Sequence, residues 1–165
     1  MSAIADFRLI ETSRLNDLRD NAEIKIEKKL FSKKVIDKYW DYLDSISKKI
    51  ENFDGSGYIF GNLLVFLEEK KGIDLLKSSY DEIVNSIVEK RQTSAFIFTF
   101  DHRQKYLDKL DPDNFTIDEL ITFNKEFSED DDMEFAKAEI DAIKLLQDNL
   151  KLLTGDNIVI LLNVG

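Results

Sequence analysis

The chain has 165 residues, 43% of them hydrophobic and including 12 Phe, 5 Tyr and 1 Trp, which is enough apolar surface for a folded core and excludes a disordered chain. Its 33 acidic and 23 basic residues give a formal charge of −10, which disfavours binding to nucleic acid and to anionic membranes. The absence of cysteine excludes disulfides, thiolate zinc sites and thiol nucleophiles, as expected of a cytoplasmic protein.

The first residues predict a short strand near residues 3–9, because apolar and polar side chains alternate there. Asp6 and Arg8 interrupt the apolar run, so no secretory signal is expected. No later stretch approaches the ~18 uninterrupted apolar residues of a membrane span. Thr12 or Ser13 is expected to cap a short helix that ends at about Asp20.

A long amphipathic helix is predicted after Ser32, which has the form of a helix cap. Its apolar residues recur at steps of three and four, which places Trp40 in the core. Gly55 and Gly57 would end the helix. The expected apolar face consists of Ile36, Trp40, Leu43, Ile46, Ile50 and Phe53.

The central part predicts two helices, near residues 58–70 and 79–90, and then a buried strand near residues 94–100 that is rich in aromatic and β-branched side chains. Asp101 is expected to cap a helix over about residues 102–109. Pro112 marks a break, and Thr116 with Glu119 has the form of a capping box that opens a helix to about residue 125.

The longest helix is predicted over about residues 130–153, with Gly155 as its stop signal. A nearly continuous apolar strand near residues 157–164 follows, as in the middle of a sheet. Together these elements predict one α+β domain over residues 1–165, with a small mixed sheet of about three strands and several amphipathic helices. The stripe of the long helix is Met133, Ala136, Ile140, Ile143, Leu146, Leu150 and Leu153.

The order of these elements resembles the YfbM-like family of small bacterial proteins. The resemblance rests mainly on apolar spacing over nearly the whole chain, and it closes on Val164-Gly165 after the long helix. Family members often carry a His and a Thr-Gly after the tryptophan helix, where this sequence reads Asp44-Ser45-Ile46-Ser47. The resemblance implies an α+β fold and no activity. The other matching positions are Met1, Ile4, Phe7, Leu15, Leu18, Trp40, Leu43 and the segment 98–107.

No catalytic motif is evident. His102 is the only histidine, and a zinc site would need carboxylates at a spacing that the chain does not offer. No Gly-x-Ser-x-Gly nucleophile motif occurs. We therefore predict a protein that is not an enzyme and has no cofactor or metal. A small enzyme whose site combines His102 with scattered carboxylates and tyrosines stays open as an alternative.

The sharpest local feature is a run of five carboxylates in six positions before the longest helix: Glu129, Asp130, Asp131, Asp132 and Glu134. Acidic residues in a first turn stabilise a helix through its dipole. Five exceed what a cap needs, and they form a negative patch that can steer a basic partner. The predicted partner is a basic protein, in concrete form a toxin domain that this chain neutralises as an immunity protein. A housekeeping interaction protein is the alternative, and the oligomeric state stays open.

Overall fold

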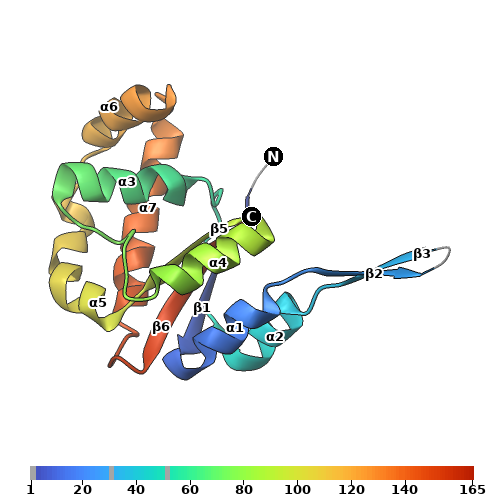
Figure 1. Ribbon diagram of the computed structural model, residues 1–165. Coiled ribbons are helices and arrows are strands. Elements are labelled where there is room, and N and C mark those ends of the chain that lie inside the picture. The colour runs from blue at the N-terminus through green and yellow to red at the C-terminus, as the bar shows by residue number, and fades with distance from the viewer. Residues whose placement is uncertain (1–2, 30–31, 51–52) are drawn as a thin grey trace.

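The computed structural model describes residues 3–29, 32–50 and 53–165 (Figure 1). The strands are β1 (Ala5–Glu11), β2 (Lys25–Lys29), β3 (Ser32–Ile36), β4 (Ser47–Lys49), β5 (Ser94–Phe98) and β6 (Ile158–Val164). The α-helices are α1 (Leu15–Asn21), α2 (Tyr39–Ile46), α3 (Ile59–Lys71), α4 (Asp81–Arg91), α5 (Phe100–Tyr106), α6 (Ile117–Ser128) and α7 (Met133–Leu150). Short 3-10 helices cover Thr12–Arg14, Asp108–Leu110 and Pro112–Asn114.

The main sheet has the strand order β4-β1-β6-β5, and each neighbouring pair is antiparallel. The α+β class and the three predicted strands are confirmed. The sheet is larger than expected, because β4 adds a fourth strand at one edge, and its described strands form no parallel pair. β6 lies between β1 and β5, and its side chains alternate between two buried cores, with Leu162 in one and Leu161 in the other, which explains its nearly continuous apolar sequence.

Helices cover both faces of this sheet. Phe7 and its cross-strand partner Leu162 belong to a core that α3, α6 and α7 complete, whereas Ile10 and its partner Val159 face α1, α2 and α4. The alternation follows from the period of two in a strand, since successive side chains point to opposite faces. The sheet is therefore the middle of three layers (Figure 1).

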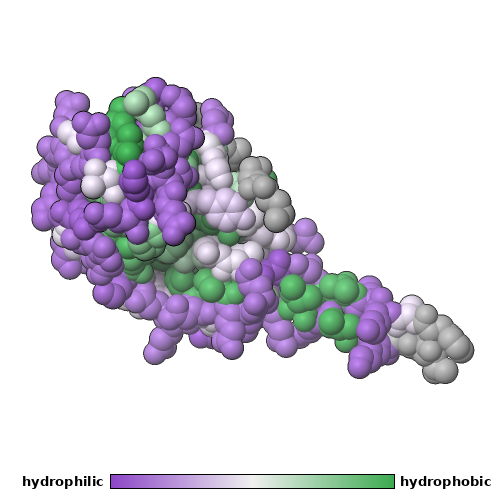
Figure 2. Space-filling model, turned by 90° about the horizontal axis from the view of Figure 1, so that it is seen from above, coloured by the Kyte–Doolittle hydropathy of each residue, from purple (hydrophilic) through white to green (hydrophobic). Residues whose placement is uncertain are grey.

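A two-stranded ribbon, β2 and β3, projects from this body, and we call residues 24–29 and 32–36 the arm (Figure 1). Its cross-strand neighbours Ile26 and Val35 are 59% and 62% exposed. Figure 2 shows the resulting hydrophobic surface along the arm. The prediction of one helix from Ser32 to Phe53 is wrong, because its first residues pair with β2 and residues 47–49 pair with β1.

The helix within that segment starts at Tyr39, where the backbone N–H donates to the Asp37 carboxylate over 3.1 Å. Tyr39 and Leu43, one turn apart, are fully buried, while Trp40 is 42% exposed. The placement of Trp40 in the core is thus wrong. The buried face of α2 runs through Tyr39 and Leu43, so the tyrosine takes the place expected of the tryptophan.

One predicted helix end is confirmed, and the others are wrong. The capping box of Thr116 and Glu119 is confirmed, with both reciprocal hydrogen bonds present. Thr99, not Asp101, caps α5, and neither Thr12 nor Ser13 makes a capping hydrogen bond. The long helix ends at Leu150, well before Gly155. The described glycine with a positive φ is Gly72, which ends α3.

Candidate functional site

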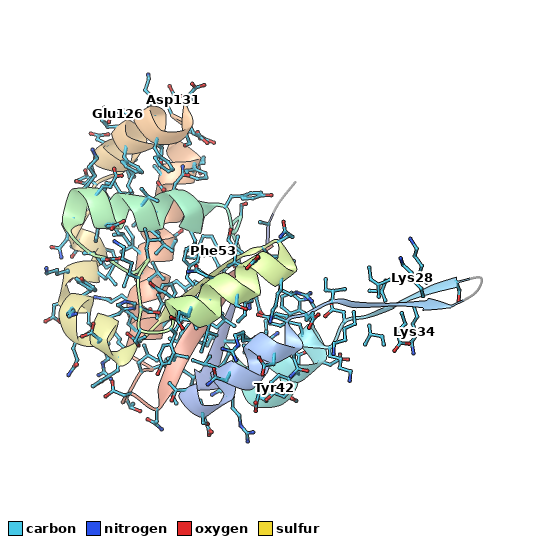
Figure 3. The ribbon with its side chains drawn as sticks, viewed as in Figure 1. Lys28, Lys34, Tyr42, Phe53, Glu126 and Asp131 are labelled. Atoms are coloured by element: carbon cyan, nitrogen blue, oxygen red, sulfur yellow. The ribbon has the colours of Figure 1, made fainter. Side chains whose placement is uncertain are left out.

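Four of the five predicted carboxylates lie in the turn that joins α6 to α7, and Glu134 lies in the first turn of α7. We call residues 126–134 the acidic end. This segment has six carboxylates and no lysine or arginine. Figure 3 shows Glu126 and Asp131 at the tip of this helix pair, far from Lys28 and Lys34 on the arm. A cluster of negative charge and a cluster of lysines therefore lie far apart on the molecule.

Two of the five carboxylates hold the turn itself. Asp132 is the N-cap of α7, and its side chain accepts from the Glu134 N–H over 2.9 Å. The Asp130 carboxylate accepts from the Asp132 N–H over 2.9 Å. These bonds confirm that part of the acidic run serves as a cap.

The other carboxylates have looser partners. Asp131 lies 3.5 Å from Lys125 Nζ, and Glu134 lies 2.6 Å from Lys137 Nζ. All four side chains are exposed to solvent, so these pairs contribute little to stability. Glu129 is exposed and has φ 58°, as the residue that ends α6. Glu129, Asp131 and Glu134 are thus available to a partner.

Two apolar side chains stand among these carboxylates. Phe127 is 50% exposed and Met133 is 54% exposed. Phe127 stacks on the buried Phe123 at a centroid distance of 5.2 Å, which holds its ring in one orientation. The expected burial of Met133 in the stripe of the long helix is wrong, because the helix starts at this residue and its first turn extends beyond the core.

The base of the acidic end contains a buried carboxyl group. Glu139 of α7 is fully buried, and Asn124 Nδ2 of α6 donates to its Oε2 over 2.6 Å. Burial raises the pKa of Glu139 to about 7, the Asn124 bond lowers it in part, and the nearby Asp130 charge raises it further. Asn124 Oδ1 in turn accepts from Asn62 of α3 over 3.3 Å. Polar contacts therefore link α6 to both helices beneath it.

His102 is a structural residue of α5. It is 3% exposed, its Nδ1 accepts from the Thr99 N–H over 3.2 Å, and its Nε2 lies 2.8 Å from the Lys77 carbonyl oxygen. Both ring nitrogens are thus engaged with the backbone. Burial lowers the pKa of His102, which favours the neutral ring. Its neighbour Asp101 pairs with Lys105 on the surface.

Two further kinds of feature, a metal site and a membrane span, were sought in the described part of the chain. No group of three or more potential ligand side chains there is arranged to hold a metal ion. Within the same residues, no helix combines the length and the apolar character needed to cross a bilayer.

Sequence reasoning found the carboxylates but missed Phe127. The predicted helix stopped near residue 125, so the residue one turn after Phe123 was not considered part of its apolar face. The i, i+4 spacing of the two phenylalanines was the available signal. The arm was missed as well, because residues 32–36 were predicted to begin the long helix, whereas they pair with residues 25–29.

Comparison of the chain with protein-family models, with curated proteins and with solved structures gave no match. The resemblance to the YfbM-like family therefore stays a prediction.

Proposed function

We propose that this chain is a non-catalytic protein-binding module whose acidic end engages a basic surface of another protein. Its concrete form is an immunity protein that occludes a basic toxin domain acting on nucleic acid or nucleotides. The observation that carries the proposal is the pair of exposed apolar side chains, Phe127 and Met133, within a segment of six carboxylates.

This composition matches the anatomy of a binding surface. Interfaces combine an apolar centre with a polar rim, and aromatic and methionine side chains are enriched at the centre. An aromatic ring that is already held in place loses little conformational entropy on binding. Phe127, stacked on Phe123, meets this condition.

The charge supports the choice of partner. Six carboxylates on one protruding tip, in a chain of formal charge −10, attract a basic surface over a distance of about a Debye length. A domain that acts on nucleic acid needs such a basic surface for the phosphate backbone. A protein that covers this basic surface would keep the nucleic-acid substrate from reaching the domain.

The test is a pull-down from native lysate with tagged protein and with a charge-reversed variant, E126K/E129K/D131K. This variant spares Asp130 and Asp132, which hold the turn through their hydrogen bonds. The matched control, E11K/E23K/E82K, makes the same change in net charge at exposed positions elsewhere.

We expect one stoichiometric basic protein with the wild type and with the control variant, and its loss with E126K/E129K/D131K. Raising the salt concentration should weaken the capture, as for any electrostatically steered association. A partner that both charge variants retain equally would refute the role of the acidic end. The absence of any stoichiometric partner would refute the proposed function.

A further inference from the structure

The two faces of the arm differ in character. Successive side chains of a strand point to opposite faces. The register of β2 and β3 therefore places four exposed side chains together on what we call the open face of the arm: Ile26, Lys28, Lys33 and Val35. Lys28 and Lys34 project from opposite sides of the ribbon in Figure 3, in agreement with this division.

The open face carries positive charge that nothing on it balances. Lys28 lies directly opposite Lys33, and like charges in such a cross-strand pair destabilise a ribbon. On the other face, Glu27 lies opposite Lys34, which is the favourable arrangement. The open face contains no carboxylate, so negative charge brought from outside the arm would stabilise its lysine pair.

Apolar side chains stand next to these lysines. Ile26 and Val35 form the neighbouring cross-strand pair, and Ile24, just before β2, is exposed as well. Interfaces join apolar centres and match opposite charges around them. The open face therefore fits a surface whose exposed apolar side chains lie among carboxylates.

The acidic end of the same chain is a surface of this kind. It exposes Phe127 and Met133 within a segment of six carboxylates. The strands of the arm, residues 25–29 and 32–36, contain five lysines and one glutamate. The two surfaces are thus complementary in charge, and each has apolar side chains to offer the other.

These two surfaces do not meet within one molecule. Figure 3 shows them far apart. The base of the arm is held to the body, because Arg91 Nη1 of α4 donates to the Asp37 carboxylate over 2.7 Å, and the Arg91 side chain is only 8% exposed. The same carboxylate accepts from the Tyr39 N–H. A contact between the arm and the acidic end can therefore form only between two copies.

We propose that the open face of the arm binds the acidic end of a second copy of this chain. The two lysines of the open face then lie among the carboxylates, and its two apolar side chains pack on Phe127 and Met133. The contact joins two different surfaces, so each pair of copies leaves one arm and one acidic end free. Association therefore continues to larger species or closes into a ring.

This contact is weak, because a narrow ribbon and one helix turn form an interface below the standard size. Dilute protein is therefore monomeric, with its arm and its acidic end both free. A basic partner that binds the acidic end more tightly displaces the arm. The inference goes beyond the proposed function and does not depend on a foreign partner, since it concerns the purified chain alone.

Sedimentation velocity of the purified chain, from low-micromolar to near-millimolar concentration, tests the proposal. We expect the average mass of the wild type to rise above that of one chain as the concentration increases, and to fall back when the salt concentration is raised. K28E/K33E removes the positive charge of the open face, and E126K/E129K/D131K cancels the net charge of the acidic end. Each variant alone lacks one of the two surfaces and should stay monomeric.

A mixture of the two variants is the sharpest test. It supplies one intact arm and one intact acidic end, so it should form a 1:1 pair that grows no further, which also shows that both variants are folded. The matched control, K109E/K144E, makes the same change in charge as K28E/K33E at exposed positions elsewhere and should associate as the wild type does.

Four results would overturn the proposal: a wild type that stays monomeric at near-millimolar concentration, a single variant that associates as the wild type does, a mixture that forms no pair, or a control that is as monomeric as K28E/K33E. Continued association of E126K/E129K/D131K alone would mean that arms pair with arms. Failure of the lysate pull-down would leave these results unchanged, so the two proposals fail separately.

Discussion

The acidic end and the arm both expose apolar side chains next to charges that are all or mostly of one sign, but they are built in different ways. The acidic end caps two helices that pack on a third and on the core, whereas the arm is two strands with no layer beneath them. Residues 25–36 contain five lysines and one glutamate, against the six carboxylates of the acidic end. An isolated two-stranded ribbon is marginally stable in water. Of the two surfaces, only the acidic end therefore holds its exposed apolar side chains, Phe127 and Met133, on a base of packed helices.

The largest effect should come from removing that base. Phe123 is 4% exposed and contacts the Phe66 ring at 5.3 Å, so Phe123→Ala should lower the free energy of unfolding by about 3–5 kcal/mol. Urea denaturation measures the loss. Phe127→Ala is the control, and we expect less than half of that loss because the side chain is half exposed. Equal losses would show that Phe127 contributes as much to the stability of the fold as Phe123, which would contradict the roles assigned to the two rings.

The buried carboxyl of Glu139 should make the same base sensitive to pH. The folded pKa of about 7 lies above the ordinary value of 4.5, so the folded state holds a proton that the unfolded chain releases. Stability contributed by the protonated group is therefore complete below pH 4.5 and is lost as the pH rises toward 7. At pH 8, Glu139→Gln should be more stable than the wild type by about 3 kcal/mol.

Urea denaturation at pH 4, 6 and 8 tests this prediction, with Glu126→Gln as the exposed control. The gain from Glu139→Gln should grow with pH, while the control should show no such trend. A gain that is the same at all three pH values would mean that folding does not raise the pKa of Glu139.

A smaller effect is expected at the turn of the acidic end. Asp132→Ala removes the cap bond to the Glu134 N–H and should cost about 1 kcal/mol. Asp131→Ala removes a carboxylate with only an exposed lysine partner and should change stability by less than half as much. Thermal unfolding of the two variants in parallel would measure the difference, and a larger loss for Asp131→Ala would reverse the roles assigned to them.

The smallest effect should come from the arm. Ile26→Thr with Val35→Thr keeps the β-branched shape and changes two side chains that are more than half exposed, so stability should change by less than about 0.5 kcal/mol. Ile97→Thr, at a 3% exposed position of β5, is the control and should cost several times more. A comparable loss from the arm variant would indicate that the arm packs against the rest of the molecule.

The contrast also separates what sequence could predict from what it could not. β6 and the capping box of Thr116 were predictable, because their signals are local: an apolar run, and two polar residues three positions apart. The arm and β4 were not, because the pairing of β3 with the preceding strand β2, and of β4 with the distant strand β1, overrode a helical spacing that continued through Trp40. The carboxylates of the acidic end were readable from the run itself. The pairing of Asp6 with Asn163 depends on strand register across the whole chain, which no local pattern encodes.

Hydrogen–deuterium exchange of the purified complex with the captured partner tests the central claim most directly. Backbone amides of residues 123–135 should become protected on binding, while those of residues 25–29 and 32–36 should exchange at the same rate as in the free protein. Protection confined to the arm, or absent from residues 123–135, would contradict the proposal that the acidic end is the binding surface.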